Sequence, residues 1–180
     1  MKELRFHGRG GQGVVKAAQI IVSAVVDTGK YGQFIPFFGV ERKGSPVFGF
    51  LRVDDKDIRI KTQVYTPEIL VVFDDTLLPM EKTFEGLQEN GVVIINTKKS
   101  IDELNLPENA KEVYLLDATG IALENIKRNI PNTTMLGAFA KACEDFIDWE
   151  VLQQNIQAKF GDANVKSAQV AYDKVQKYSL

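Results

Sequence analysis

The chain has 180 residues, of which 44% are apolar and 26% are charged, and its formal net charge is −2. These values are ordinary for a globular protein of one domain, so we treat residues 1–180 as a single domain. They exclude the strong positive charge of a nucleic-acid-binding protein, and no apolar run is long enough for a signal peptide or a membrane span. We therefore expect a cytoplasmic protein with no nucleic-acid and no membrane partner.

The most distinctive stretch lies near the amino terminus. Leu4–His7 predicts a short strand, and Val14–Thr28 has the apolar spacing of an amphipathic helix. The amides at a helix N-terminus are unpaired, and glycine lets an anion approach them, so the intervening turn predicts a site for a phosphate-bearing cofactor. The alternative is a turn that only allows the strand and the helix to pack. Three of the turn's glycines follow the spacing G-x-G-x-x-G, and the candidate residues are Gly8, Arg9, Gly10, Gly11, Gln12 and Gly13.

Two well-known nucleotide sites do not fit this turn. The phosphate loop of nucleotide triphosphatases ends in Gly-Lys-Ser/Thr, whereas Gly13 is followed by Val14 and Val15. A nicotinamide site requires an acidic residue roughly twenty residues further on, at the end of a second strand. Asp27 is the nearest acid, but it falls where the first helix should end. The residues therefore support neither ATP hydrolysis nor hydride transfer.

The scarcity of cysteine and histidine restricts the possible chemistry. Cys143 is the only cysteine and His7 the only histidine. One thiolate cannot hold an iron–sulfur cluster or form a disulfide within the chain. A metal site lacks a second histidine or a cysteine partner, and a Ser-His-Asp triad would have to use this one imidazole. We expect no metal site, a buried Cys143 that packs as a small apolar residue, and a His7 that shapes the turn at the end of the first strand.

The remaining chain alternates between predicted strands and helices. Tyr31–Ile35 predicts a second strand, and Val47–Val53 a third that forms a hairpin with a half-exposed strand at Ile58–Thr62. Short apolar runs predict buried parallel strands, and amphipathic segments predict helices. The fold class expected is α/β, with a mostly parallel Rossmann-like sheet, helices on both faces, an antiparallel hairpin at the edge and a helical C-terminal third. The further strands are predicted at 69–73, 92–95 and 112–116, and the further helices at 77–89, from 117, and at 135–145, 149–159 and 164–178.

Four polar residues outside the first turn are further candidates. Arg42 and Lys43 follow the second strand beside Gly44 and Ser45 and could contact phosphate, or could belong to a solvated turn. Asn96 lies just past a buried strand, where α/β sheets collect polar contacts. Asn132 precedes a predicted helix, and either it or Thr133 is expected to be the N-cap.

Several of these stretches together resemble a known family. Their order and spacing are similar to those in the gamma subunit of 2-oxoacid:ferredoxin oxidoreductases, the pyruvate type in particular. The resemblance extends over nearly the whole chain, and it departs from the family pattern at Thr134, where a proline is usual. The motifs that carry it are 6–13 (Phe-His-Gly-Arg-Gly-Gly-Gln-Gly), 37–46 (Phe-Phe-Gly-Val-Glu-Arg-Lys-Gly-Ser-Pro), 75–78 (Asp-Thr-Leu-Leu) and 130–138 (Ile-Pro-Asn-Thr-Thr-Met-Leu-Gly-Ala).

The resemblance implies an activity and a set of partners. It implies oxidative cleavage of a 2-oxoacid, transfer of the acyl group to coenzyme A, and electron transfer to ferredoxin or flavodoxin. Thiamine diphosphate and the [4Fe-4S] clusters would be held by alpha, beta and delta partner subunits. This chain would dock coenzyme A, with its diphosphate on the Gly8–Gly13 turn and its phosphates contacted by Arg42 and Lys43. Asn132 and Asn96 match polar contacts of the same region, and no catalytic acid or base is expected in this chain.

Two other functions remain open at this point. The chain could be a non-catalytic scaffold within the same complex, or a stand-alone nucleotide- or flavin-binding α/β domain. The sequence does not identify the 2-oxoacid, because the substrate pocket of such an enzyme is expected on other subunits.

Overall fold

A mixed β-sheet is the centre of the structure, which is a computed structural model and describes residues 1–38 and 44–180. Within these residues the sheet has seven strands in the order β2-β3-β1-β4-β5-β6-β7. In chain order they are β1 (Lys2–Arg9), β2 (Tyr31–Phe38), β3 (Pro46–Asp54), β4 (Ile69–Val72), β5 (Gly91–Asn96), β6 (Ala110–Leu116) and β7 (Gln176–Ser179).

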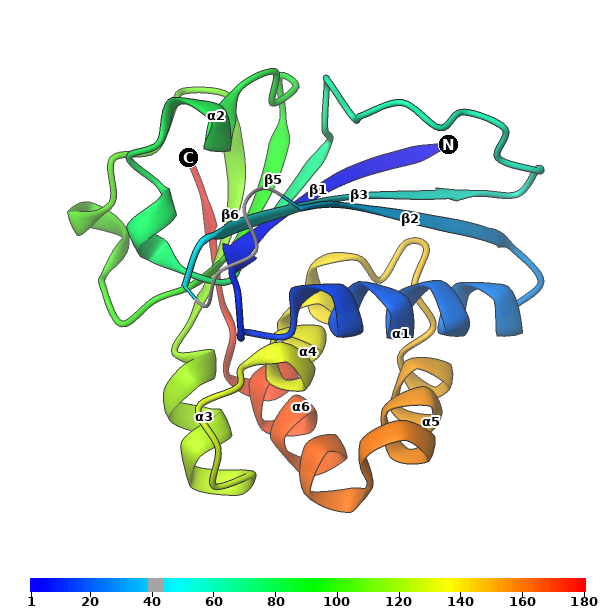
Figure 1. Cartoon of the computed structure of the whole chain (residues 1–180). Coiled ribbons are helices and arrows are strands. Elements are labelled where there is room, and N and C mark those ends of the chain that lie inside the picture. Colours follow the sequence, from blue (N-terminus) through cyan, green and yellow to red (C-terminus); the bar gives the residue numbers. More distant parts are fainter. Residues whose placement is uncertain (39–43) are drawn as a thin grey trace.

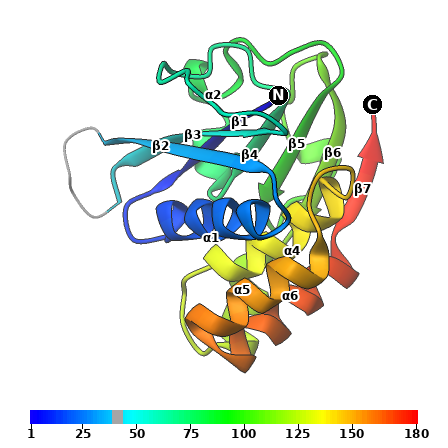
Figure 2. The same ribbon diagram turned by 90° about the vertical axis from the view of Figure 1, so that its right-hand side faces the viewer.

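The four central strands β1, β4, β5 and β6 run parallel to one another. On one side β3 pairs antiparallel with β1, and β2 pairs antiparallel with β3. On the other side β7 pairs antiparallel with β6 and forms the edge that carries the carboxyl terminus (Figure 2). The predicted α/β class is confirmed, and so is the helical C-terminal region. Because the central strands are parallel, their carboxyl ends meet at one edge of the sheet.

The two faces of the sheet are covered unequally. Figure 1 shows the longer helices gathered on one side of the sheet and the short helix α2 on the other. The second face is completed by short helical turns and connecting segments, which bury a smaller apolar cluster around Leu70, Val93 and Leu115. The longer helices are α1 (Val14–Asp27), α3 (Ala118–Asn125), α4 (Asn132–Ala142), α5 (Trp149–Phe160) and α6 (Asp162–Lys174), and the short ones are η1 (Asp75–Leu77), α2 (Glu81–Phe84) and η2 (Ile101–Glu103).

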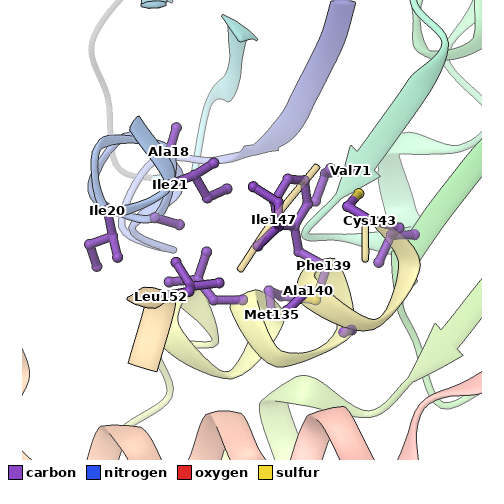
Figure 3. Packing of buried hydrophobic residues seen from close by; sticks show 14 of the residues in the cluster. Ala18, Ile20, Ile21, Val71, Met135, Phe139, Ala140, Cys143, Ile147 and Leu152 are labelled. Carbon is purple, nitrogen blue, oxygen red and sulfur yellow. The ribbon is translucent and has the colours of Figure 1, made fainter. Parts of the chain in front are cut away.

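The main core lies between the sheet and the longer helices. Phe6 of β1 is 1% exposed, and its ring centroid lies 6.1 Å from that of Phe139 on α4 and 6.3 Å from that of Phe73. Side chains of α1, α4 and the start of α5 converge beside β4 in Figure 3, where the buried Cys143 packs at the edge of the same cluster. The predicted apolar role of Cys143 is confirmed.

Alternation along β1 sends its apolar and polar residues to opposite faces. Leu4 and Phe6 face the longer helices, whereas Arg5 and His7 are buried on the other face. The Nε2 atom of His7 accepts a hydrogen bond of 2.9 Å from Arg5 Nε, and the ring lies edge-on to Phe48. His7 therefore lies beside Arg5 on the face of the sheet opposite the longer helices, and the prediction that it shapes the turn is wrong.

The predicted hairpin is wrong in its second strand. The strand at Pro46–Asp54 pairs with Tyr31–Phe38, and residues 58–62 form no strand. Phe34 of β2 packs against the main core, whereas Ile60 stays 46% exposed and offers little apolar burial. The strand at 31–38 also continues through Pro36, which an edge strand tolerates because one side of its backbone needs no partner.

Two predicted helices have other boundaries. The helix predicted at 77–89 is replaced by η1 and α2, because Pro79 interrupts the segment and Gly86 adopts a φ of +72°. The helix predicted at 164–178 ends at Lys174, and the chain then adds β7 to the sheet. No helix in the described ranges is long and apolar enough to cross a bilayer.

Candidate functional site

The carboxyl edge of the parallel strands gathers most of the predicted site residues. β1 leads into Gly8–Gly13, which we call the glycine loop, β4 leads into Asp74–Thr76, and β5 ends at Asn96. The glycine loop then passes directly into α1, so the strand–turn–helix context predicted from the sequence is present.

Two glycines of this loop are required by its geometry. A β-carbon on Gly8 would overlap the Val14 side chain and lie 3.2 Å from Cβ of Phe73. Gly13 is the N-cap of α1 and has a φ of +78°, which residues with a side chain rarely adopt. The loop is therefore closely packed against both α1 and the end of β4.

The N-terminus of α1 presents backbone amides with no carboxylate in the first turn. In any α-helix the first amides lack intrahelical acceptors and carry a partial positive charge. Gly10, Gly11, Gly13 and the first turn of α1 line a hollow of about 810 Å³. The hollow therefore offers the main-chain donors that an anion needs.

Positively charged side chains surround this hollow. Lys16 comes from the first turn of α1, Arg128 from the segment after α3, and Lys159 from the last turn of α5. All three are exposed, and within the described ranges none forms an ion pair. No carboxylate is among the described residues that line the hollow, so its electrostatic potential favours a polyanion.

None of these three cations was predicted from the sequence. The sequence could have indicated Lys16, because it lies three residues after Gly13 on the first helical turn. No local sequence pattern indicates Arg128 or Lys159, since only the packing of the helical layer brings them to the glycine loop.

Asn132 lies at this hollow, as the sequence led us to expect, but it is not a cap. It is the first residue of α4, whose N-cap is Pro131, so the predicted capping by Asn132 or Thr133 is wrong. The Asn132 side chain is 5% exposed and lines the hollow, and its Oδ1 accepts a hydrogen bond of 2.8 Å from the Thr133 amide. No acceptor for its Nδ2 is present among the described residues, so that donor is available to a ligand.

Asn96 lies in a different hollow, of about 400 Å³, beside Asp75, Thr97 and Asp117. Its Nδ2 donates to the Phe73 carbonyl and to Thr119 Oγ1, both at 2.9 Å, and its Oδ1 accepts from the Thr119 amide. The amide is thus occupied by contacts that join the ends of β4, β5 and β6. Gln12 of the glycine loop lines the same hollow, but Asn96 does not line the hollow at the N-terminus of α1.

Arg9 and Gln12 lie in the glycine loop, and Arg9 also lines the hollow, but the side chains of both contact protein groups. Arg9 lies 3.3 Å from Asp74 and donates to Thr76 Oγ1 and to the Gly44 carbonyl. Gln12 donates to Asp74 at 2.9 Å.

The other two predicted cations, Arg42 and Lys43, lie outside the described residues. The amide of the next residue, Gly44, donates to the Gly10 carbonyl at 3.1 Å, and the Gly10 amide donates to the Ser45 carbonyl at 2.9 Å. No group of three or more His, Cys, Asp or Glu side chains that could hold a metal occurs in the described part of the chain.

Comparison with known proteins decides the family. The profile of the pyruvate ferredoxin/flavodoxin oxidoreductase family matches residues 3–174. The chain belongs to this family. It is 48% identical, over the full length of both chains, to the common gamma subunit of pyruvate and ketoisovalerate oxidoreductases from Thermococcus kodakarensis. It is 46% identical to subunit PorC of pyruvate synthase from Methanothermobacter marburgensis, over 98% of both chains.

A solved structure of the family agrees with this assignment. The pyruvate oxidoreductase subunit PORC from Thermotoga maritima superposes with a TM-score of 0.86 at 34% identity, covering 99% of this chain and 98% of that one. The resemblance to gamma subunits found in the sequence is thereby confirmed. The chain is a gamma subunit of a pyruvate or 2-oxoacid:ferredoxin oxidoreductase, and so part of a multi-subunit enzyme that passes electrons to ferredoxin.

Proposed function

We propose that this gamma subunit docks coenzyme A in the hollow beside the glycine loop. The observation that carries the proposal is the convergence of Lys16, Arg128 and Lys159 on the N-terminus of α1, with no carboxylate among the described lining residues. A site built in this way suits a ligand with several phosphates better than a neutral or cationic one.

Coenzyme A has the charges that such a site requires. Its diphosphate suits the amides of Gly11, Gly13 and the first turn of α1, which have no acceptor among the described residues, and its ribose phosphate suits a nearby cation. The donor at Asn132 Nδ2 is a further polar contact, and Phe160 offers an aromatic surface at the same hollow. Arg42 and Lys43 are proposed to contribute as well, from the family resemblance alone.

The remaining cofactors are proposed to lie on partner subunits. This chain has one cysteine, which is buried in the core, so the chain lacks the thiolates that an iron–sulfur cluster needs. Thiamine diphosphate and the clusters would be held by alpha, beta and delta subunits, and ferredoxin or flavodoxin would receive the electrons. The bound coenzyme would supply the thiol that takes up the acyl group, while this chain fixes the position of the coenzyme.

The choice of 2-oxoacid is proposed to reside outside this chain. The relative from Thermococcus kodakarensis is described as a subunit common to pyruvate and ketoisovalerate oxidoreductases. A gamma subunit shared by enzymes for two substrates does not need to distinguish them, and the same is proposed here.

Charge reversal in the assembled complex tests the docking. We expect Lys16→Glu, Arg128→Glu and Lys159→Glu each to raise the KM for coenzyme A roughly tenfold, the size of one lost charged contact. Decarboxylation of the 2-oxoacid without coenzyme A should be unaffected. Lys56→Glu is the matched control, because Lys56 is exposed and follows β3 at the opposite edge of the sheet.

The same experiment separates the alternatives. An unchanged KM for coenzyme A in all three variants would contradict docking at this hollow. If the variants instead released the subunit from the complex during gel filtration, the chain would be a scaffold whose basic surface contacts a partner. A flavin absorbance band in the purified chain would favour a stand-alone flavin-binding domain.

A further inference from the structure

A hydrogen-bond network connects the glycine loop to the end of β4. It consists of Arg9, Gln12, Asp74 and Thr76, and we call it the Asp74 network. The Asp74 carboxylate accepts from Gln12 Nε2 at 2.9 Å and from the Thr76 amide at 3.0 Å, and it lies 3.3 Å from Arg9 Nε. Thr76 Oγ1 donates to Asp74 and accepts from Arg9 Nη2 at 2.7 Å.

The network closes on the backbone of the loop itself. Gln12 Oε1 accepts from the Arg9 amide at 2.7 Å, and the Gln12 amide donates to the Arg9 carbonyl at 3.1 Å. The side-chain amide of Gln12 thus uses its carbonyl on the loop and its amino group on Asp74. Both polar groups of the Gln12 side chain are therefore bonded to the protein, and neither lines the hollow at the N-terminus of α1.

Arg9 is occupied in the same way. Its Nε and Nη2 donate to Thr76, and its Nη1 donates to the Gly44 carbonyl at 3.1 Å. Burial alone would raise the pKa of Asp74, but the hydrogen bonds from Thr76 and Gln12 and the charge of Arg9 hold that pKa below its usual value. Asp74 is therefore ionised at neutral pH, and it offsets the charge of Arg9.

A loop that binds anions through its backbone needs such restraint. Glycine has more freedom to lose than any other residue, so a loop with four glycines among its six residues is costly to hold in one conformation. Amides that point to the ligand before it arrives bind it more tightly than amides that must first be ordered. In this loop the restraint comes from side chains that use their polar groups on the protein.

We propose that Arg9, Gln12, Asp74 and Thr76 are positioning residues that hold the glycine loop in its anion-binding conformation. This inference rests on the proposed docking of coenzyme A and assigns to Arg9 and Gln12 a role different from direct contact. Thr76 is the informative member, because it is exposed and lies outside both hollows, so it can influence a ligand only through Arg9 and Asp74.

The test compares Thr76→Val with Thr76→Ser in the complex. Valine removes the hydroxyl and keeps the shape, whereas serine keeps the hydroxyl. Hydrogen–deuterium exchange without coenzyme A should be faster at residues 9–16 in Thr76→Val, and the KM for coenzyme A should rise about three- to tenfold at unchanged kcat. Thr76→Ser should keep both the exchange rate at residues 9–16 and the KM for coenzyme A near the values of the unmodified protein. Gln12→Leu, which removes two of the bonds, should give the same pattern more strongly.

Two results would overturn the proposal. Unchanged exchange at residues 9–16 in Thr76→Val and Gln12→Leu would show that the network does not restrain the loop. Faster exchange with an unchanged KM for coenzyme A would show that the restraint does not matter for the ligand. In the second case, a raised KM in Lys16→Glu, Arg128→Glu and Lys159→Glu would leave the docking site intact, whereas an unchanged KM there would remove the docking proposal as well.

Discussion

The side-chain nitrogen of Asn132 packs against Gly13 so closely that a β-carbon at residue 13 would lie 2.7 Å from Nδ2. This contact joins the start of α4 to the start of α1, two segments that are 119 residues apart in the chain. It places the side-chain nitrogen of Asn132, which has no acceptor among the described residues, beside the first-turn amides of α1. The absence of a side chain at residue 13 is therefore needed for the site as well as for the turn.

Replacing Gly13 by alanine should impair docking as well as folding. The β-carbon would displace Asn132, and the left-handed conformation at φ +78° would cost about 1–2 kcal/mol. We expect the KM for coenzyme A to rise tenfold or more in the complex. Gly29→Ala is the matched control, since Gly29 has a φ of +83° and open space around it, at the far end of α1. Equal KM values for coenzyme A in the two variants would contradict a role in docking for the contact between residue 13 and Asn132.

A buried arginine on the other face of the sheet should dominate stability. Arg52 is 1% exposed, pairs with Glu3 at 2.7 Å and donates to the carbonyls of Thr62 and Gln63. Arg52→Met would leave these acceptors without a donor, so we expect a loss of about 3–5 kcal/mol in the free energy of unfolding. Urea denaturation of the full chain measures this loss.

The control for Arg52 is an arginine in an exposed ion pair. Arg59 lies 3.1 Å from Asp57, and both side chains are largely exposed. Arg59→Met should change the free energy of unfolding by less than about 0.5 kcal/mol. Similar losses in the two variants would argue against a special role for the buried pair that anchors residues 62–63 to the sheet.

The single histidine gives a pH dependence of defined sign. Burial and the charge of Arg5 lower the pKa of His7 from 6.5 to about 3, so folded His7 stays neutral at pH values where the unfolded chain is protonated. Stability should therefore fall as the pH drops from about 6.5 toward 3, with a contribution from His7 of about 1.4 kcal/mol per pH unit. In NMR spectra the His7 ring proton should not titrate between pH 8 and 5, and a midpoint near 6.5 would show that the ring is accessible.

The structure could be predicted from the sequence wherever the local pattern and the tertiary packing favour the same element. The unit of β1, glycine loop and α1 was predicted because its strand, its glycines and its helical period lie within 28 residues. The buried strands β4, β5 and β6 were predicted because strands buried on both faces form short apolar runs. The apolar role of Cys143 followed from its helical neighbours in the same way.

Features that depend on distant partners were missed. β7 has the sequence Gln-Lys-Tyr-Ser, which has no strand pattern of its own and becomes a strand by pairing with β6. The choice of β2 as the hairpin partner of β3 depends on the core that Phe34 joins. Arg128 and Lys159 acquire their place from the packing of α3 and α5, which no local spacing records.

The most direct measurement is a structure of the assembled oxidoreductase with coenzyme A bound. We expect the diphosphate to lie against the glycine loop and the first turn of α1, with a phosphate within reach of Lys16, Arg128 or Lys159. Coenzyme A bound elsewhere, with this hollow filled by a partner subunit, would contradict it.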